Sequence, residues 1–390
     1  MLSKKAALLF LAMVILVCPS FFAALYIYDP MSIFHTPYSR ELTLSSNMRR
    51  QNIALIRHLP FDSVIVGNSY TENTSAREAG EQLGGQFINI SMSGSNLYER
   101  SVVLEYVLRH HKIKTVFGVL TERTNREVHR SYPLSEWSFL YDDNITNDFK
   151  VYLNRRYLGC LIKWSNSPEC IGRQVDLDRP AAWFEETAHA SRFGGLDNWI
   201  MHHENEQLAD LLHKTLPQNV NKPIFQREKD IAPKVAMSIR AAIDEFIIQP
   251  AKEYPATNFV YFFNPDLILG RAFEVRGNGL NVHAFWVRET TLRCATLNNV
   301  QLYFFDNEPF TEDIQYYKDI GHYSPDINSL ILQSVRLGKN RLTPDNVEAQ
   351  LHLLAERAAA YDIKAINAYI QEGIRRMDAD ATSENLFFVE

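Results

Sequence analysis

The sequence predicts an α/β protein. We expect a three-layer sandwich in which helices cover both faces of a central, mainly parallel sheet of five strands, with an inserted cap region and an N-terminal transmembrane helix. Two observations predict the sandwich. Short runs rich in Val, Ile and Phe alternate with helical stretches, as in βαβ units, and 390 residues can bury a large core. The third observation, an uncharged apolar run near the N-terminus, predicts the transmembrane helix.

The composition is that of a globular protein, with 46% hydrophobic and 22% charged residues. The formal net charge is −6, and the sequence contains no run rich in Lys and Arg. We therefore expect no nucleic-acid partner, because binding nucleic acid needs a basic surface.

The N-terminal apolar run covers residues 6–28, follows Lys4 and Lys5, and precedes Asp29. As a helix it would be about 34 Å long, which is enough for the ~30 Å hydrocarbon core of a bilayer. The two lysines predict that residues 1–5 form a short cytoplasmic tip and that the run is a single-pass anchor. The rest of the chain would then lie outside the cytoplasm. A cleaved signal peptide is the alternative, although the sequence FAA within the run fits a cleavage site poorly.

A linker is expected at residues 29–60, and the first part of the core at residues 61–122. This part holds three of the five expected strands, each a short apolar run that ends on polar residues. The helix that follows the first strand ends at Gly84 and Gly85, as helices often do. We expect strands at 63–69, 86–92 and 114–122, and helices at 75–84 and 97–111.

The alternation of strands and helices stops between residues 123 and 230, which predicts an insertion or cap beside the sheet. Loops at strand ends often carry specificity, so this insertion is a candidate cover for a site. Cys160 and Cys170 lie within it, and an oxidising compartment would permit a disulfide between them. Unrelated thiols, together with Cys294, are the alternative. Short helices are expected at 179–195 and 197–216.

The second part of the core, residues 231–338, restores the alternation. Its last helix is expected to have Ser324 as its N-cap and Pro325 at its first position, and to close on Gly338. Residues 339–390 form a C-terminal helical extension. We expect helices at 231–254, 284–296 and 322–338, and strands at 258–265 and 300–306.

Polar residues follow each expected strand. In an open parallel sheet the carboxyl ends of the strands meet at one edge, and ligands bind outside that edge. The residues that the sequence places there, in strand order, are Gly67, Asn68 and Ser69; Gly94 and Asn96; Thr121, Glu122 and Asn125; Asn264, Pro265 and Asp266; and, beyond the fifth strand, Asp319 and His322.

These residues form a candidate site for nucleophilic catalysis. A serine hydroxyl such as that of Ser69 needs a base to take its proton, and His322 is the candidate base. A carboxylate three residues earlier, Asp319, can hold the imidazole in one tautomer, and Asp313 is a second candidate for that role. The backbone N–H groups of Ser69 and Gly94 are candidate donors to an oxyanion.

The segments "VIVGNS", "NISMSGSN" and "DIGH" together resemble the blocks of the SGNH (GDSL-like) hydrolase family. The resemblance covers about residues 62 to 337 and implies the roles of nucleophile for Ser69, oxyanion donor for Gly94, and triad partners for Asp319 and His322. The apolar N-terminus, the Asn-Pro after the fourth strand and "YYKDIGHYS" resemble an envelope branch of that family. This branch includes the D-alanylation protein of lipoteichoic acid synthesis and the alginate O-acetylation proteins.

The chain departs from the family pattern at two places. Asn68 stands where Gly-Asp-Ser has aspartate, and "GVLTERTN" has no asparagine at the position that supplies an oxyanion donor in the third block. Asn96 and Asn125 are candidate replacements for that donor. A weakened oxyanion hole disfavours fast hydrolysis more than it disfavours slow acyl transfer.

We therefore expect a serine acyltransferase or acyl-esterase, anchored in a bacterial inner (cytoplasmic) membrane, that acts on acyl groups of an envelope polysaccharide through acyl-Ser69. The resemblance implies a membrane-bound O-acyltransferase as the partner that supplies the acyl group. A non-catalytic anchored adaptor that binds a polysaccharide or such a partner is the alternative. We expect no cofactor. We also expect no metal at His202 and His203, because adjacent positions on a helix point in different directions.

Overall fold

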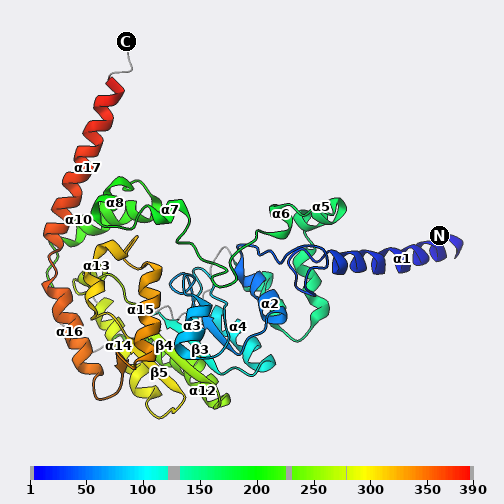
Figure 1. Ribbon diagram of the computed structural model, residues 1–390, viewed down its shortest axis with the longest axis horizontal. Helices are drawn as coiled ribbons and strands as arrows, with labels where there is room; N and C mark the ends of the chain where they lie inside the picture. Colours follow the sequence, from blue (N-terminus) through cyan, green and yellow to red (C-terminus); the bar gives the residue numbers. More distant parts are fainter. Residues whose placement is uncertain (1–3, 122–131, 225–230, 278, 387–390) are drawn as a thin grey trace.

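The computed structural model describes residues 4–121, 132–224, 231–277 and 279–386. At its centre is a six-stranded sheet with the strand order β2-β1-β3-β4-β5-β6 (Figure 1). The strands are β1 (Ser63–Val66), β2 (Phe87–Asn89), β3 (Thr115–Leu120), β4 (Asn258–Phe263), β5 (Val300–Phe304) and β6 (Arg341–Leu342).

The first five strands are parallel and lie at the five expected positions. Their apolar runs are buried on both faces, which is typical of parallel sheets. The expected count of five strands is wrong, because β6 pairs antiparallel with β5 through Leu302 and Leu342. A two-residue strand is too short to give a hydrophobic pattern, so the sequence carried no signal for it.

Alternate residues of the strands point into two separate cores. Val64 and Val116 belong to one core, and their neighbours Ile65 and Phe117 belong to the other. This alternation with a period of two gives three layers, with helices on both faces of the sheet. Over the first face lie α2 (Met48–His58), α4 (Leu97–His110), α11 (Pro233–Ile243), α14 (Gly279–Cys294) and α16 (Val347–Ala360). Over the second lie α3 (Ala76–Leu83), α8 (Leu196–Met201), α15 (Pro325–Arg336) and α17 (Ile363–Leu386).

Helix α1 (Lys4–Tyr28) extends away from the body of the molecule (Figure 1). Its segment Ala6–Tyr28 has a mean hydropathy of 2.6 and is long and apolar enough to cross a membrane. Among its described side chains, those of the last turns contact the rest of the protein, where Leu25 and Tyr28 are buried. The carboxylate of Asp29 accepts hydrogen bonds from the backbone N–H groups of residues 33–35, at 2.8–3.0 Å. These bonds fix the direction in which the chain leaves α1.

Residues 29–60, expected to be a linker, are part of the folded domain. They contain α2, eight of whose residues are buried, and they form a β-bridge between Leu44 and Arg173. The hydroxyl of Tyr152 also donates to Asp29, at 2.5 Å. The end of α1 is therefore attached to the domain through packed structure and not through a free tether.

The described part of the insertion consists of short helices. The helix expected at 179–195 is reduced to four residues, and the one expected at 197–216 is divided at Asn205, which caps a new helix. The elements are η1 (Leu134–Glu136), η2 (Ser138–Tyr141), η3 (Ile145–Tyr152), α5 (Arg155–Lys163), α6 (Pro168–Ile171), α7 (Thr187–Ala190), α8, α9 (Glu206–Asp210), η4 (Leu211–Thr215) and α10 (Leu216–Asn219). As Figure 1 shows, α5 and α6 lie near α1, whereas α8 and α10 lie beside α17.

The remaining elements complete the core around the second half of the sheet. They are η5 (Asp244–Ile248), α12 (Gln249–Glu253), α13 (Ile268–Glu274), η6 (Pro309–Glu312) and η7 (Ile314–Tyr316). Ser324 and Pro325 begin α15 as expected, and Gly338, just beyond it, adopts a positive φ of 65°.

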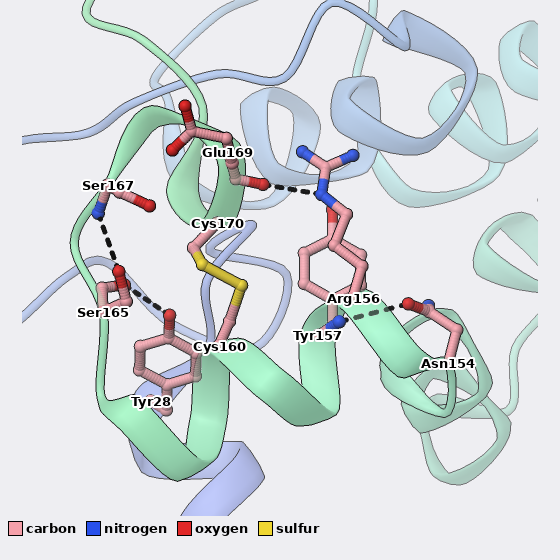
Figure 2. Close-up of a disulfide and its surroundings, with 9 residues drawn as sticks. All are labelled: Tyr28, Asn154, Arg156, Tyr157, Cys160, Ser165, Ser167, Glu169 and Cys170. Atoms are coloured by element: carbon pink, nitrogen blue, oxygen red, sulfur yellow. Dashed lines mark hydrogen bonds between the residues drawn. A yellow bond between two sulfur atoms is a disulfide. The ribbon is translucent and has the colours of Figure 1, made fainter.

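The expected disulfide between Cys160 and Cys170 is present and joins α5 to α6 (Figure 2). The hydroxyl of Tyr28, at the end of α1, donates to the carbonyl of Ser165 within the loop that the disulfide closes, at 2.5 Å. The ring of Tyr28 also contacts Trp164, with ring centres 5.1 Å apart. The disulfide therefore braces the part of the insertion that contacts the end of α1.

Replacing Cys160 and Cys170 together with serine is expected to lower the free energy of unfolding by about 3 kcal/mol. The bridge closes a loop with a sequence separation of 10 residues, and a loop of this size constrains the unfolded chain by roughly that amount. Urea denaturation with and without a reducing agent measures the effect. Cys18→Ser is the matched control, because this cysteine is free and exposed. An unfolding midpoint that does not change when the disulfide is reduced would contradict the prediction.

Candidate active site

Ser69 lies in a tight turn that follows strand β1 at the edge of the sheet. At Gly67 an added Cβ would lie 2.0 Å from the Thr71 hydroxyl, so the turn packs too closely for any other residue. The Asn68 side chain accepts the backbone N–H of Tyr70 at 3.2 Å, and the Asn68 carbonyl accepts that of Thr71 at 3.0 Å. These contacts end the strand and leave Ser69 half-buried in the lining of a cleft.

Ser69, His322 and Asp319 form one hydrogen-bonded series. The Oγ of Ser69 lies 2.9 Å from Nε2 of His322, and Nδ1 of His322 lies 2.9 and 3.0 Å from the two oxygens of Asp319. A carboxylate only accepts, so Nδ1 carries the ring proton and Nε2 is left to accept from the serine. This is the geometry of a serine that is activated by a base.

The Asp319 carboxylate is held by several donors. It accepts the backbone N–H groups of Gly321 and His322 at 3.0 and 2.9 Å, and the ammonium of Lys318 at 2.9 Å. Burial alone would raise the pKa of Asp319, but the charges and hydrogen bonds of His322 and Lys318 outweigh it and hold the pKa well below its usual range. Asp319 is therefore ionised throughout the neutral range. Asp313, the other candidate, instead accepts from Gln315.

Two residues that the sequence did not reveal support this series. Lys318 is buried, and burial lowers its pKa, while its ammonium also donates to Gln207 at 3.0 Å. Trp183, from the insertion, donates its indole N–H to the carbonyl of Ser69 at 2.9 Å and meets the ring of His322 edge-on, with centres 5.5 Å apart. Trp183 is separated from Ser69 by 114 positions in the sequence, and no local pattern marks a contact of that kind.

The candidate oxyanion donors differ in where they lie and in what they bind. Gly94 lines the cleft near Ser69 and has a φ of 65°, which glycine adopts without strain. Within the part of the chain that the structure describes, the backbone N–H groups of Ser69 and Gly94 donate to no protein acceptor. Asn96 is instead the N-cap of α4, where it exchanges hydrogen bonds with Glu99, and it does not line the cleft. Asn125 lies outside the described residues.

The cleft beside Ser69 has a volume of about 1000 Å³, at the upper end of the usual range for ligand sites. The insertion forms one wall, from Pro180 through Trp183 to His189, so this segment covers the site. Leu44, Ser45, Ser46 and Met48 also line the cleft, as do Arg156, Glu169 and Arg173 of the insertion. The cleft lining therefore includes residues next to Cys170 and Ile171, which pack against Tyr28 at the end of α1, and it carries charged groups of both signs.

Two further groups on the cleft have shifted pKa values. Burial lowers the pKa of His189 to about 4, and Lys318 and Arg192 add to the effect; Arg192 also donates to Nδ1 of His189 at 2.5 Å. His189 is therefore neutral at pH 7. Burial raises the pKa of Glu72 to about 8, against the opposing charge of Arg49. Glu72 thus presents a largely protonated carboxyl to the cleft at neutral pH.

Replacing Glu72 with glutamine is expected to remove a dependence of stability on pH. Between pH 4.5, where the carboxyl ionises in the unfolded chain, and about pH 8, the folded protein keeps a proton that the unfolded chain has lost. The stability of the wild type therefore falls by ~1.4 kcal/mol per pH unit across this window because of Glu72. In urea titrations, the free energy of unfolding of Glu72→Gln should increase relative to that of the wild type from pH 5 to pH 8 and then level off.

Glu186→Gln is the matched control for this prediction. Glu186 lines the same cleft, but its side chain is 67% exposed. We expect the free energy of unfolding of this variant to depend on pH as that of the wild type does. If Glu72→Gln kept that slope too, the buried carboxyl would not be the source of the effect.

Comparisons of the chain with protein-family models, with curated proteins and with solved structures found no match. The interpretation of this site therefore depends on its own geometry.

Proposed function

We propose that the chain is a serine acyltransferase or acyl-esterase of the SGNH type, anchored by α1, that acts on acyl groups of a cell-envelope polysaccharide. The observation that carries the proposal is the hydrogen-bonded series Ser69–His322–Asp319, whose first two members line the large cleft. A metal or cofactor is not needed for this chemistry. The volume and polar lining of the cleft suit a segment of glycan better than a small ester alone.

The reaction has two halves. Nε2 of His322 takes the proton of Ser69 as the Oγ–carbon bond forms at the acyl carbonyl, and Asp319 stabilises the resulting imidazolium. The backbone N–H groups of Ser69 and Gly94 face the negative charge on the carbonyl oxygen, and each such donor is worth about 10²–10³ in rate. His322 then gives the proton to the departing alcohol, which leaves acyl-Ser69. A glycan hydroxyl or water attacks this ester in the second half, by the same proton transfers in reverse.

A fluorophosphonate probe tests the proposal because it labels a serine only where a base activates it. We expect labelling of Ser69 that is lost in Ser69→Ala and strongly reduced in His322→Gln, while Ser93→Ala, at a serine that also lines the cleft, is labelled like the wild type. Failure to label Ser69 in folded protein would favour the alternative function, a non-catalytic adaptor.

Two features support a location outside the cytoplasm. Helix α1 is long and apolar enough to cross a bilayer, with lysines at its start. The Cys160–Cys170 disulfide is typical of an oxidising compartment. We therefore propose a single-pass protein of a bacterial inner membrane with its active site on the outer side. An acyltransferase there needs an acyl supply across the membrane, and we propose a membrane-bound O-acyltransferase as that partner.

Removing the anchor is expected to abolish glycan acylation in cells but to leave ester hydrolysis by the purified protein within about threefold. Tyr28, at the end of α1, packs against Cys170 and Ile171, next to the cleft-lining residues Glu169 and Gly172, so the anchor holds this part of the cleft near the bilayer. The truncated protein should begin at Ser20, behind a cleavable export signal, because Leu25 and Tyr28 are buried in the domain and must be kept. Full acylation in cells by this exported protein would contradict the proposed membrane partner.

A further inference from the structure

A second group of chemically notable side chains lies in the insertion, apart from the residues that line the cleft. It consists of His203 and Glu204, in the turn after α8, and His213 on η4. Nδ1 of His203 lies 3.2 Å from Nε2 of His213 and 3.3 Å from Oε1 of Glu204, and the last two atoms are 3.9 Å apart. Three potential ligand atoms therefore lie close enough together to bind one ion.

These separations match the first coordination sphere of a transition metal. Zinc binds imidazole nitrogen and carboxylate oxygen at ~2.0–2.1 Å, and tetrahedral geometry then places neighbouring ligand atoms about 3.3 Å apart. A hydrogen bond between the two imidazoles would by itself account for the approach of His203 and His213. The carboxylate oxygen of Glu204, 3.3 Å from the nitrogen of His203 and 3.9 Å from that of His213, adds a third potential ligand atom.

The local structure turns the ligands towards one another. His213 lies on η4, a π-helical turn, and π turns are rare elements that occur frequently at functional sites. His203 is buried, with only 8% of its surface exposed, so its ring is held in place. Its other nitrogen, Nε2, lies 3.9 Å from the carboxylate of Asp378 on α17, which is longer than a hydrogen bond. His202 is not part of the group; the expectation of no metal considered His202 and His203 as a pair, whereas the group joins His203 to His213, ten positions later.

We propose that His203, Glu204 and His213 bind a divalent transition metal of borderline softness, with zinc as the best fit, and that water completes the tetrahedron. Two imidazoles and one carboxylate favour such ions over magnesium or calcium, which prefer all-oxygen sites. The role is structural. The ligands come from the segment that packs on α17, whose Ile370 and Ile374 share a core with Ile200 of α8. A bound ion would therefore strengthen the attachment of the C-terminal helix to the insertion.

The test uses the full chain in detergent, stripped of metal with a chelator and titrated with Zn²⁺ by calorimetry. We expect one strong site per chain, and a rise in the thermal unfolding midpoint of ~3–5 °C when free Zn²⁺ exceeds the dissociation constant about 100-fold. Co²⁺ at the same site should give the visible absorption bands of a tetrahedral centre. Absence of a strong site in the stripped wild type would overturn the proposal.

The variants His213→Gln and Glu204→Gln identify the ligands. Both side chains are exposed enough for substitution without loss of the fold, and far-ultraviolet circular dichroism verifies this. Each variant should weaken Zn²⁺ binding by about 100-fold or more and remove the midpoint shift. His202→Gln is the matched control and should bind as the wild type does. Equal weakening by His202→Gln, or unchanged binding by His213→Gln, would contradict the proposed site.

Discussion

Ser69→Ala is expected to lower acyl turnover by about 10⁴–10⁶-fold, because it removes the nucleophile of a base-activated serine. The protein should remain folded. Ser69 is half-buried, and its side chain hydrogen-bonds to His322. Hydrolysis of an acetyl ester by the purified protein measures the loss, and thermal unfolding measures the stability.

Ser93→Ala is the control for this variant, since Ser93 is a serine on the same cleft whose side chain is exposed. It should keep the turnover of the wild type within about threefold. Turnover by Ser69→Ala within tenfold of the wild type would mean that the acyl group is not transferred through this serine.

Asp319→Asn is expected to lower turnover by ~10⁴-fold, because an amide no longer selects the His322 tautomer that accepts from Ser69. This variant should also lose stability. Lys318 and Asp319 form a buried ion pair, with 2% and 12% of their side chains exposed, and breaking such a pair leaves an uncompensated charge that costs about 3–5 kcal/mol.

A double variant separates these two effects. Lys318→Met combined with Asp319→Asn removes both charges, so urea denaturation should show most of the lost stability restored. Turnover should stay as low as in the single variant, because the tautomer of His322 is still not fixed. Recovery of turnover together with stability would show that Asp319 acts only through the fold and not through His322.

Much of the fold follows from local patterns in the sequence. The five parallel strands are buried on both faces and so appear as continuous apolar runs bounded by polar residues. The start of α15 at Ser324 and Pro325 follows from helix capping, which depends on neighbouring residues. Strand β6 and the packing of residues 29–60 were not predicted, because they depend on contacts with distant parts of the chain.

The same distinction applies to the candidate site. Ser69, Asp319 and His322 could be found because they follow strands and because Asp-x-x-His lies within one turn. Asn96 was predicted as an oxyanion donor, whereas the structure uses it to cap α4. Its spacing from Glu99 is that of a capping box, a signal that favours a structural role.

Lys318 and Trp183 support the site through contacts that the spacing of residues in the sequence does not indicate. Lys318 stands next to Asp319 in the sequence, but its burial depends on Trp183, whose ring centre lies 4.9 Å from the ammonium, and on Gln207 of α9. Both of these partners belong to the insertion, which has no regular period. The support of the triad is therefore a property of the tertiary structure.

Acylation of Ser69 is tested by measuring the mass of the protein during turnover. The wild type is mixed with an activated acetyl ester, quenched with acid within one turnover, and analysed intact and after digestion. We expect an added acetyl group on the peptide that contains Ser69. This adduct should be absent from Ser69→Ala and should be discharged when a glycan acceptor is supplied. Turnover without any adduct on Ser69, or an adduct on another residue that persists in Ser69→Ala, would contradict this expectation.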